Sequence, residues 1–258
     1  MDKSLIGEFQ LDWILAGKSK QAADNYVTGL KLLIEEYPNP SLEEVKTWLA
    51  SIKSTASRRK RGQAVRAFGQ WSETNGYGVF EWWKRVPLVR EVSRPQTTVS
   101  EKDYKLTLNS AKTPRDKALI EVLWSCGLRR SEIARLEISD VNFLEGFLVI
   151  RSSKTGKPRI SPLSPAARRA LRKHIGKKTQ GSLFGMSTNA IRLCLQRLEA
   201  PSAHAWRRGW TVEALRNGVS ETSVCAAAGW ASSAMVSRYT RALSAELAVK
   251  EFQRRWSN

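Results

Sequence analysis

The chain has 258 residues, 41% of them hydrophobic, which allows one large or two smaller globular units and excludes a disordered chain. Its 43 lysines and arginines against 24 acidic residues give a formal net charge of +19, which indicates a polyanionic partner such as nucleic acid. The three distant cysteines, the two histidines and the lack of a long apolar run exclude a disulfide framework, a usual zinc site and a membrane span. We therefore expect a protein of a reducing, cytoplasmic compartment with no membrane partner.

The positive charge begins partway along the chain. Residues 1–52 carry five basic and eight acidic side chains, residues 53–94 carry ten and three, and residues 95–258 carry 28 and 13. A basic surface is therefore expected from about Lys53 onward.

The first 90 or so residues show helical periodicity. Apolar side chains recur at helical spacing around Phe9–Ile14 and again in Tyr26–Ile34. Pro38 and Pro40 break this pattern, and Ser41 then resembles an N-cap followed by acidic residues in a first helical turn. We predict an all-α unit over residues 1–94.

A fourth helix of this unit is amphipathic in an unusual way. Val65, Phe68 and Trp71 form one face, and polar donors fall on the other within a stripe about 60° wide. Such donors suit phosphates and base edges, although an ordinary solvated face would look the same. The residues that we expect to contact DNA here are Arg58, Arg59, Lys60, Arg61, Gln63, Arg66 and Gln70.

Residues 86–98 contain two prolines and two arginines and predict an extended basic linker to a second unit over residues 95–258. In that unit we expect helices over Asp116–Trp124, Ser131–Leu136, Pro165–Ile175, Thr188–Leu198, Thr211–Asn217 and Ser220–Ala228. A strand that starts with Phe147–Ile150 and continues through residues 151–153, and a returning strand over Pro158–Leu163, flank a turn at Lys154–Lys157. The predicted fold class is mainly α, with a small antiparallel sheet in the second unit.

Four short patterns in the second unit carry reactive groups. They are the segment CGLRRSEI at 126–133, SKTGK at 153–157, HAWR at 204–207, and the pair Gly229-Trp230 followed nine residues after Trp230 by a tyrosine. Each pattern alone is common on ordinary surfaces or in ordinary cores. Their order over about 110 residues is the specific feature.

This order resembles the tyrosine recombinases, the family of phage integrases and Xer-type resolvases, over nearly the whole chain. The positions that match the family's site residues are Arg129, Glu132, Lys154, His204, Arg207, Trp230 and Tyr239. The resemblance implies an α-helical core-binding domain over residues 1–94 and a catalytic domain over residues 95–258.

The resemblance implies that Tyr239 attacks a DNA phosphate and forms a covalent 3′-phosphotyrosine, which stores the energy of the broken bond. Tyrosine is mostly protonated at neutral pH, so His204 would assist proton movement at its hydroxyl. Lys154 would protonate the 5′ oxygen that leaves. Lys157 is a rival for this role.

The remaining matched residues would hold the phosphate. Arg129 and Arg207 would bind its non-bridging oxygens, and Trp230 would donate its indole N–H. Glu132 would orient its neighbours. Because side chains supply the positive charge and the acidic residues are not clustered, we expect no metal ion and no other cofactor.

Two positions depart from the family's usual HxLRH box. Trp206 replaces the leucine and Arg208 replaces the second histidine, so Arg208 could bind DNA instead of the reacting phosphate. His174, at the end of an Arg/Lys-rich segment, is interpreted as a surface residue near DNA without a catalytic part.

The resemblance implies a site-specific recombinase that acts on double-stranded attachment or core sites as four copies on two DNA sites, with room for an accessory directionality factor. The first helix is expected by about Phe9, so we expect no separate arm-binding domain. Two alternatives stay open: a catalytically inactive DNA-binding protein on the same fold, and an enzyme resembling type IB topoisomerases.

Overall fold

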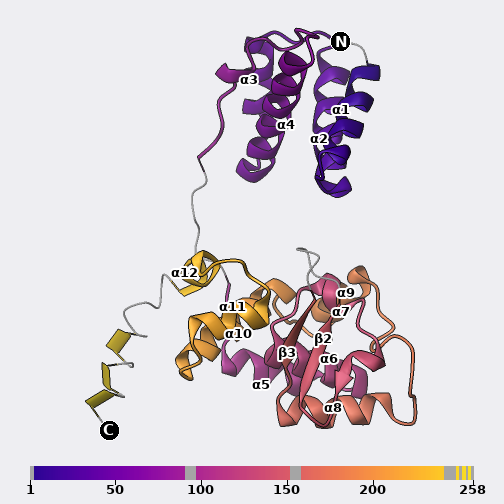
Figure 1. Cartoon of the computed structure of the whole chain (residues 1–258), viewed down its shortest axis with the longest axis vertical. Coiled ribbons are helices and arrows are strands. Elements are labelled where there is room, and N and C mark those ends of the chain that lie inside the picture. The colour runs from indigo at the N-terminus through magenta and orange to yellow at the C-terminus, as the bar shows by residue number, and fades with distance from the viewer. Residues whose placement is uncertain are drawn as a thin grey trace. The chain divides into compact units, whose positions relative to one another are not determined.

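The computed structural model describes residues 3–90, 97–151, 158–240, 248–249, 252–253 and 255–256. The chain divides into two compact units, residues 1–94 and 95–258 (Figure 1). Each unit has its own hydrophobic core. The described linker residues 87–90 and 97–98 belong to no helix or strand.

The first unit is a bundle of helices. Its elements are α1 (Lys3–Leu15), α2 (Lys20–Glu36), α3 (Leu42–Ser51), α4 (Thr55–Thr74) and the short 3-10 helix η1 (Trp83–Arg85). Phe9 and Phe68 meet edge to face in its core, with ring centroids 5.5 Å apart. The predicted cap is confirmed: the Ser41 hydroxyl accepts from the Glu44 N–H, and the Glu44 carboxylate accepts from the Ser41 N–H.

The second unit combines helices with one small sheet. Its elements are α5 (Glu101–Ser110), α6 (Pro114–Cys126), α7 (Arg130–Ile133), η2 (Ile138–Asp140), β1 (Val141–Asn142), β2 (Phe147–Ile150), β3 (Arg159–Pro162), α8 (Pro165–Ile175), α9 (Thr188–Arg197), α10 (Ala203–Arg216), α11 (Glu221–Ala228) and α12 (Ala234–Thr240). The strands are antiparallel in the order β1-β2-β3, and Phe147 pairs with Pro162. The predicted fold class is confirmed.

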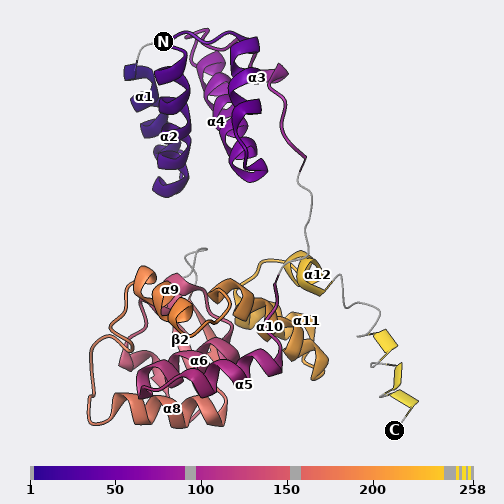
Figure 2. The same cartoon turned by 180° about the vertical axis from the view of Figure 1, so that it is seen from behind.

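Helix α6 is the centre of this unit. It packs against α8 and α10, and α8 lies on the far side of α6 from α12 in both views (Figures 1 and 2). Gly127 ends α6 in the left-handed conformation, with a φ of 55°. A Cβ there would lie 2.4 Å from the Trp210 ring of α10, so glycine is required where the two helices meet.

The structure differs from the predicted elements in three places. The helix expected over Ser131–Leu136 is the single turn α7, because the Leu136 carbonyl accepts from the Leu183 N–H instead of continuing the helix. Helix α10 begins at Ala203, eight residues before the predicted Thr211, with Ser202 as its N-cap. Helices α5 and α12 were not expected. No helix among the described residues is long and apolar enough to span a membrane.

Candidate active site

The turn from α6 into α7 fixes the first pair of predicted site residues. Arg129 is the N-cap of α7, and its backbone N–H donates to Glu132 Oε2 at 2.7 Å. Its side chain bonds to the same carboxylate, from Nη1 to Oε1 at 2.8 Å, and is 26% exposed. Arg129 can therefore be held by Glu132 and still reach solvent.

The Glu132 carboxylate is almost fully buried, with 1% of its side chain exposed, and it is bound on both oxygens. Arg159 of β3 donates from Nη1 to Oε1 at 3.0 Å and from Nη2 to Oε2 at 2.9 Å. Burial acts to raise the pKa of Glu132, but the bonds from Arg159 and Arg129 outweigh it and hold that pKa below its ordinary value. The carboxylate therefore stays charged.

Arg207 lies on α10, and its guanidinium is buried with 1% of the residue exposed. Its Nη1 donates to the Gly127 carbonyl at 2.7 Å and its Nη2 donates to the Ala228 carbonyl at 2.6 Å. Burial and then the nearby charge of Arg129 lower the pKa of Arg207 to about 10, so it is still a cation at neutral pH. Arg207 thus ties α10 to the ends of α6 and α11.

The predicted nucleophile and base face each other. The Tyr239 hydroxyl on α12 lies 3.3 Å from His204 Nε2 on α10. Burial, followed by the charges of Arg208, Arg207 and Arg129, lowers the pKa of His204, so its neutral form persists below the usual histidine range. A neutral imidazole can accept the tyrosine proton.

Trp230 lies between these groups. The guanidinium carbon of Arg207 lies 4.8 Å from the centroid of the Trp230 ring. On the same indole, the Tyr239 ring packs at a centroid distance of 5.4 Å. The described members of the predicted catalytic set are therefore linked to one another: Arg129 binds Glu132 and lowers the pKa of Arg207, Arg207 packs on Trp230, and Tyr239 contacts both Trp230 and His204.

The two predicted hairpin lysines, Lys154 and Lys157, lie outside the described residues. The structure shows the surroundings of two further residues. Arg208 is 8% exposed and donates from Nε to the Thr97 carbonyl at 2.7 Å, which joins the end of the linker to α10; its contact with DNA stays a prediction. His174 is half-buried against Phe184 and bonds to the Leu183 carbonyl, which is a packing role.

The polar stripe of α4 is also engaged within its own unit. Arg66 donates from Nε to the Val86 carbonyl at 2.8 Å, and Arg59 donates from Nη1 to the Val89 carbonyl at 3.3 Å. Arg58 binds the Ile52 carbonyl at the end of α3. These three arginines therefore donate to backbone carbonyls of their own unit, and their contact with DNA stays a prediction.

The other members of the predicted DNA-binding set differ in exposure. Arg61 stacks over the Trp48 ring at 5.3 Å, Gln63 is half-buried, and Lys60 and Gln70 are exposed. Their contact with DNA stays a prediction.

Arg159 is a residue of this site that sequence reasoning missed. Strand alternation places it on the inward face with buried Ser161, while Ile160 points outward and is 58% exposed. Side chains of β3 do alternate between the two faces of the sheet, which is a signal that the sequence contains. The usual pattern has apolar side chains inside and charged ones outside, and here the arginine is inside and the isoleucine outside.

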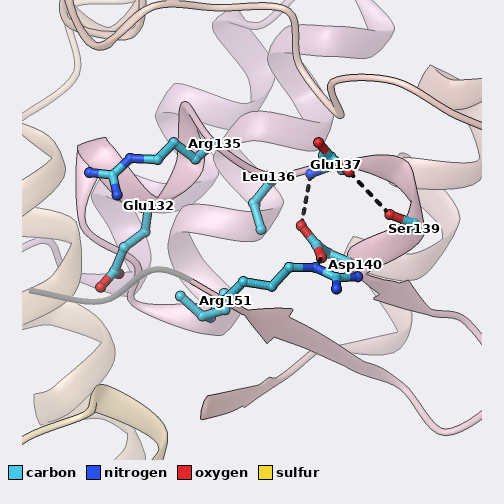
Figure 3. Close-up of a pocket in the computed structure, with 8 residues that line it drawn as sticks. Glu132, Arg135, Leu136, Glu137, Ser139, Asp140 and Arg151 are labelled. Atoms are coloured by element: carbon cyan, nitrogen blue, oxygen red, sulfur yellow. Dashed lines mark hydrogen bonds and ion pairs between the residues drawn. The ribbon is translucent and has the colours of Figure 1, made fainter. Parts of the chain in front are cut away.

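A pocket of about 280 Å³ lies beside the site (Figure 3). Glu132 and Arg135 lie on one side of it, and Glu137, Ser139 and Asp140 lie on the other (Figure 3). Glu132 is the one predicted site residue in the described part of the chain that lines it. Among the described residues, no group of three or more histidine, cysteine or acidic side chains could hold a metal ion.

Sequence comparisons find relatives among the tyrosine recombinases. Tyrosine recombinase XerA of Pyrococcus horikoshii is 30% identical over 165 residues, which cover 64% of this chain and 57% of the relative. XerA of Pyrococcus furiosus is 26% identical over 181 residues, covering 70% and 63%. The chain thus matches less than two thirds of the length of these two relatives.

Solved structures show the same fold. A lambda integrase dimer bound to a core site matches with a TM-score of 0.76 at 15% identity, over 90% of this chain and 96% of that chain. The integrase of transposon Tn1549, in complex with a circular intermediate DNA, matches with a TM-score of 0.68 at 13% identity, over 97% and 99%. The sequence model of the phage integrase family matches residues 98–246, more than half of the chain. This protein therefore belongs to the phage integrase family.

Proposed function

We propose that this protein is a site-specific DNA recombinase that cleaves and rejoins duplex DNA through a 3′-phosphotyrosine on Tyr239. The observation that carries the proposal is the Tyr239 hydroxyl 3.3 Å from His204 Nε2, beside the buried cation of Arg207. A nucleophile, a neutral base and a fixed cation are the groups that attack on a phosphodiester requires.

In the proposed reaction, His204 accepts the tyrosine proton as the Tyr239 oxygen attacks phosphorus. The new phosphorus–oxygen bond forms while the bond to the 5′ oxygen breaks, and Lys154 gives that oxygen a proton. Negative charge that builds on the non-bridging oxygens is held by Arg129 and Arg207. Religation runs the same steps in reverse with another 5′ hydroxyl, so no energy source is needed.

Trp230 has two parts in this proposal. Its ring, packed on the Arg207 guanidinium and the Tyr239 ring, sets the spacing between the cation and the nucleophile. Its indole N–H donates to the phosphate in the place where many relatives use a histidine.

We propose as partners duplex DNA core or attachment sites and three further copies of the chain, which together would exchange strands between two sites. Support comes from the net charge of +19 and from matching structures of lambda integrase, described as a dimer on a core site and as a tetramer on a Holliday junction. An accessory directionality factor would complete this set, and the reaction would take place at the nucleoid, in the cytoplasm of a prokaryotic or host cell.

The test begins with a duplex core site selected from a random-sequence library by binding to the whole chain. Two copies of that site are then placed on a supercoiled plasmid. Sites in the same orientation should yield deletion products, and sites in opposite orientation should yield inversion products. Relaxation of supercoils without recombinants would instead indicate a topoisomerase, and binding without strand breaks would indicate an inactive protein; either outcome contradicts the proposal.

A further inference from the structure

Three charged groups meet where α7, β3 and the end of α11 come together. Arg129 and Arg159 both bind Glu132, whose two oxygens accept four hydrogen bonds of 2.7–3.0 Å. A carboxylate has about four lone-pair sites, so this one is saturated. Two cations against one anion leave a net charge of +1 at the cluster.

That surplus charge depends on Arg159. With Arg159 removed, Glu132 and Arg129 would form a neutral pair, and the buried carboxylate would draw the Arg129 donors toward itself. Arg159 is itself 7% exposed, whereas the side chain of Arg129 is 26% exposed, so Arg129 is the more accessible of the two cations that bind Glu132.

The same guanidinium also holds the loop that carries Trp230. Arg159 Nε donates to the Ala227 carbonyl at 2.8 Å, and Arg207 Nη2 donates to the next carbonyl, that of Ala228, at 2.6 Å. Two arginines thus bind consecutive carbonyls at the C-terminus of α11, where a helix favours cations. Gly229 follows with a φ of 67°, and a Cβ there would lie 2.9 Å from Arg159 Cδ.

We propose that Arg159 is a positioning residue for DNA cleavage: it neutralises Glu132, so that the charge of Arg129 is available to the reacting phosphate, and it fixes the turn before Trp230. This inference rests on the proposed recombinase function. It gives β3 a part in the reaction through a side chain whose three nitrogens all donate within the protein, to Glu132 and to the Ala227 carbonyl.

The test uses single-turnover cleavage of a nicked version of the selected core-site duplex, in which the covalent adduct cannot religate. The rate constant reports on folded molecules, and misfolding lowers only the amplitude. Arg159→Met should lower the rate constant by about 10- to 100-fold, the range for coupling within one ionic network. Arg151→Met is the matched control, since it breaks an arginine–acid pair with Asp140 just beyond β2 and should leave the rate constant unchanged.

The charge argument predicts a rescue. Adding Glu132→Gln to Arg159→Met removes the carboxylate that would neutralise Arg129. The double variant should therefore cleave at least several-fold faster than Arg159→Met alone. A purely structural Arg159 would give a double variant no faster than the single one, and that result would overturn the inference. So would an Arg159→Met rate constant equal to wild type. Failure of the wild-type chain to form any adduct would instead count against the proposed function.

Discussion

Replacing Arg207 by alanine should damage the catalytic unit in two separable ways. The guanidinium makes two short bonds to the Gly127 and Ala228 carbonyls and packs on Trp230. Bonds from a charged donor contribute roughly 1.5–3 kcal/mol each, and the desolvation of the buried cation offsets part of this, so unfolding should become easier by about 3 kcal/mol. Loss of one transition-state donor should also slow cleavage by about 10²- to 10³-fold.

Both effects can be measured on the whole chain. Urea unfolding followed by tryptophan fluorescence gives the stability change, and single-turnover adduct formation on the nicked core-site duplex gives the rate constant. Arg197→Ala is the matched control, because it breaks the bond to the buried Asp116 carboxylate at 2.8 Å, remote from the reacting groups. It should lower stability and leave the rate constant intact. A rate constant for Arg207→Ala within tenfold of this control would refute the role of Arg207 at the phosphate.

Three further predictions follow from the same geometry. The pKa of His204 is lowered, so this base becomes protonated only below the usual histidine range. The cleavage rate should therefore begin to fall with decreasing pH only below pH ~6.5, and a fall that begins above this value would contradict the assignment. Arg66 donates to the Val86 carbonyl, so Arg66→Ala should weaken DNA binding without changing the slope of log affinity against log salt concentration. A slope reduced by about one would mean that Arg66 contacts a phosphate. Excess EDTA should not affect adduct formation, because arginines supply the charge, and inhibition reversed by magnesium would contradict this.

Much of the fold follows from local signals. Helix α8 was predicted with its observed ends, and strand β2 with its observed start, because their apolar spacing and flanking residues agree. Helix α10 was predicted too short because its first turns bury Arg207 and Arg208. Hydrophobic periodicity counts only apolar side chains as buried, so it does not recognise a helix whose buried face contains arginines. Helix α7 was predicted too long because the carbonyl of Leu136, at the end of the predicted helix, accepts from the Leu183 N–H, a contact that no local pattern encodes.

The site was predicted from motif order, and the structure brings the described members of that set together. The partners of each charge could not be read from the chain. For example, Arg59 and Arg66 of α4 donate to carbonyls of the segment that follows, 18 to 30 residues away in the chain. Arg159 was missed because its partner Glu132 lies 27 residues away in the chain, beyond the reach of helix or strand periodicity.

The most direct test of the central claim is to locate the covalent bond to DNA. The wild-type chain and Tyr239→Phe would each be incubated with the nicked core-site duplex, and the trapped species would be digested and sequenced by mass spectrometry. The account predicts one adduct, with a 3′ phosphate on Tyr239, and for Tyr239→Phe unchanged DNA binding with no adduct. An adduct on any other residue, or a wild-type level of adduct from Tyr239→Phe, would contradict it.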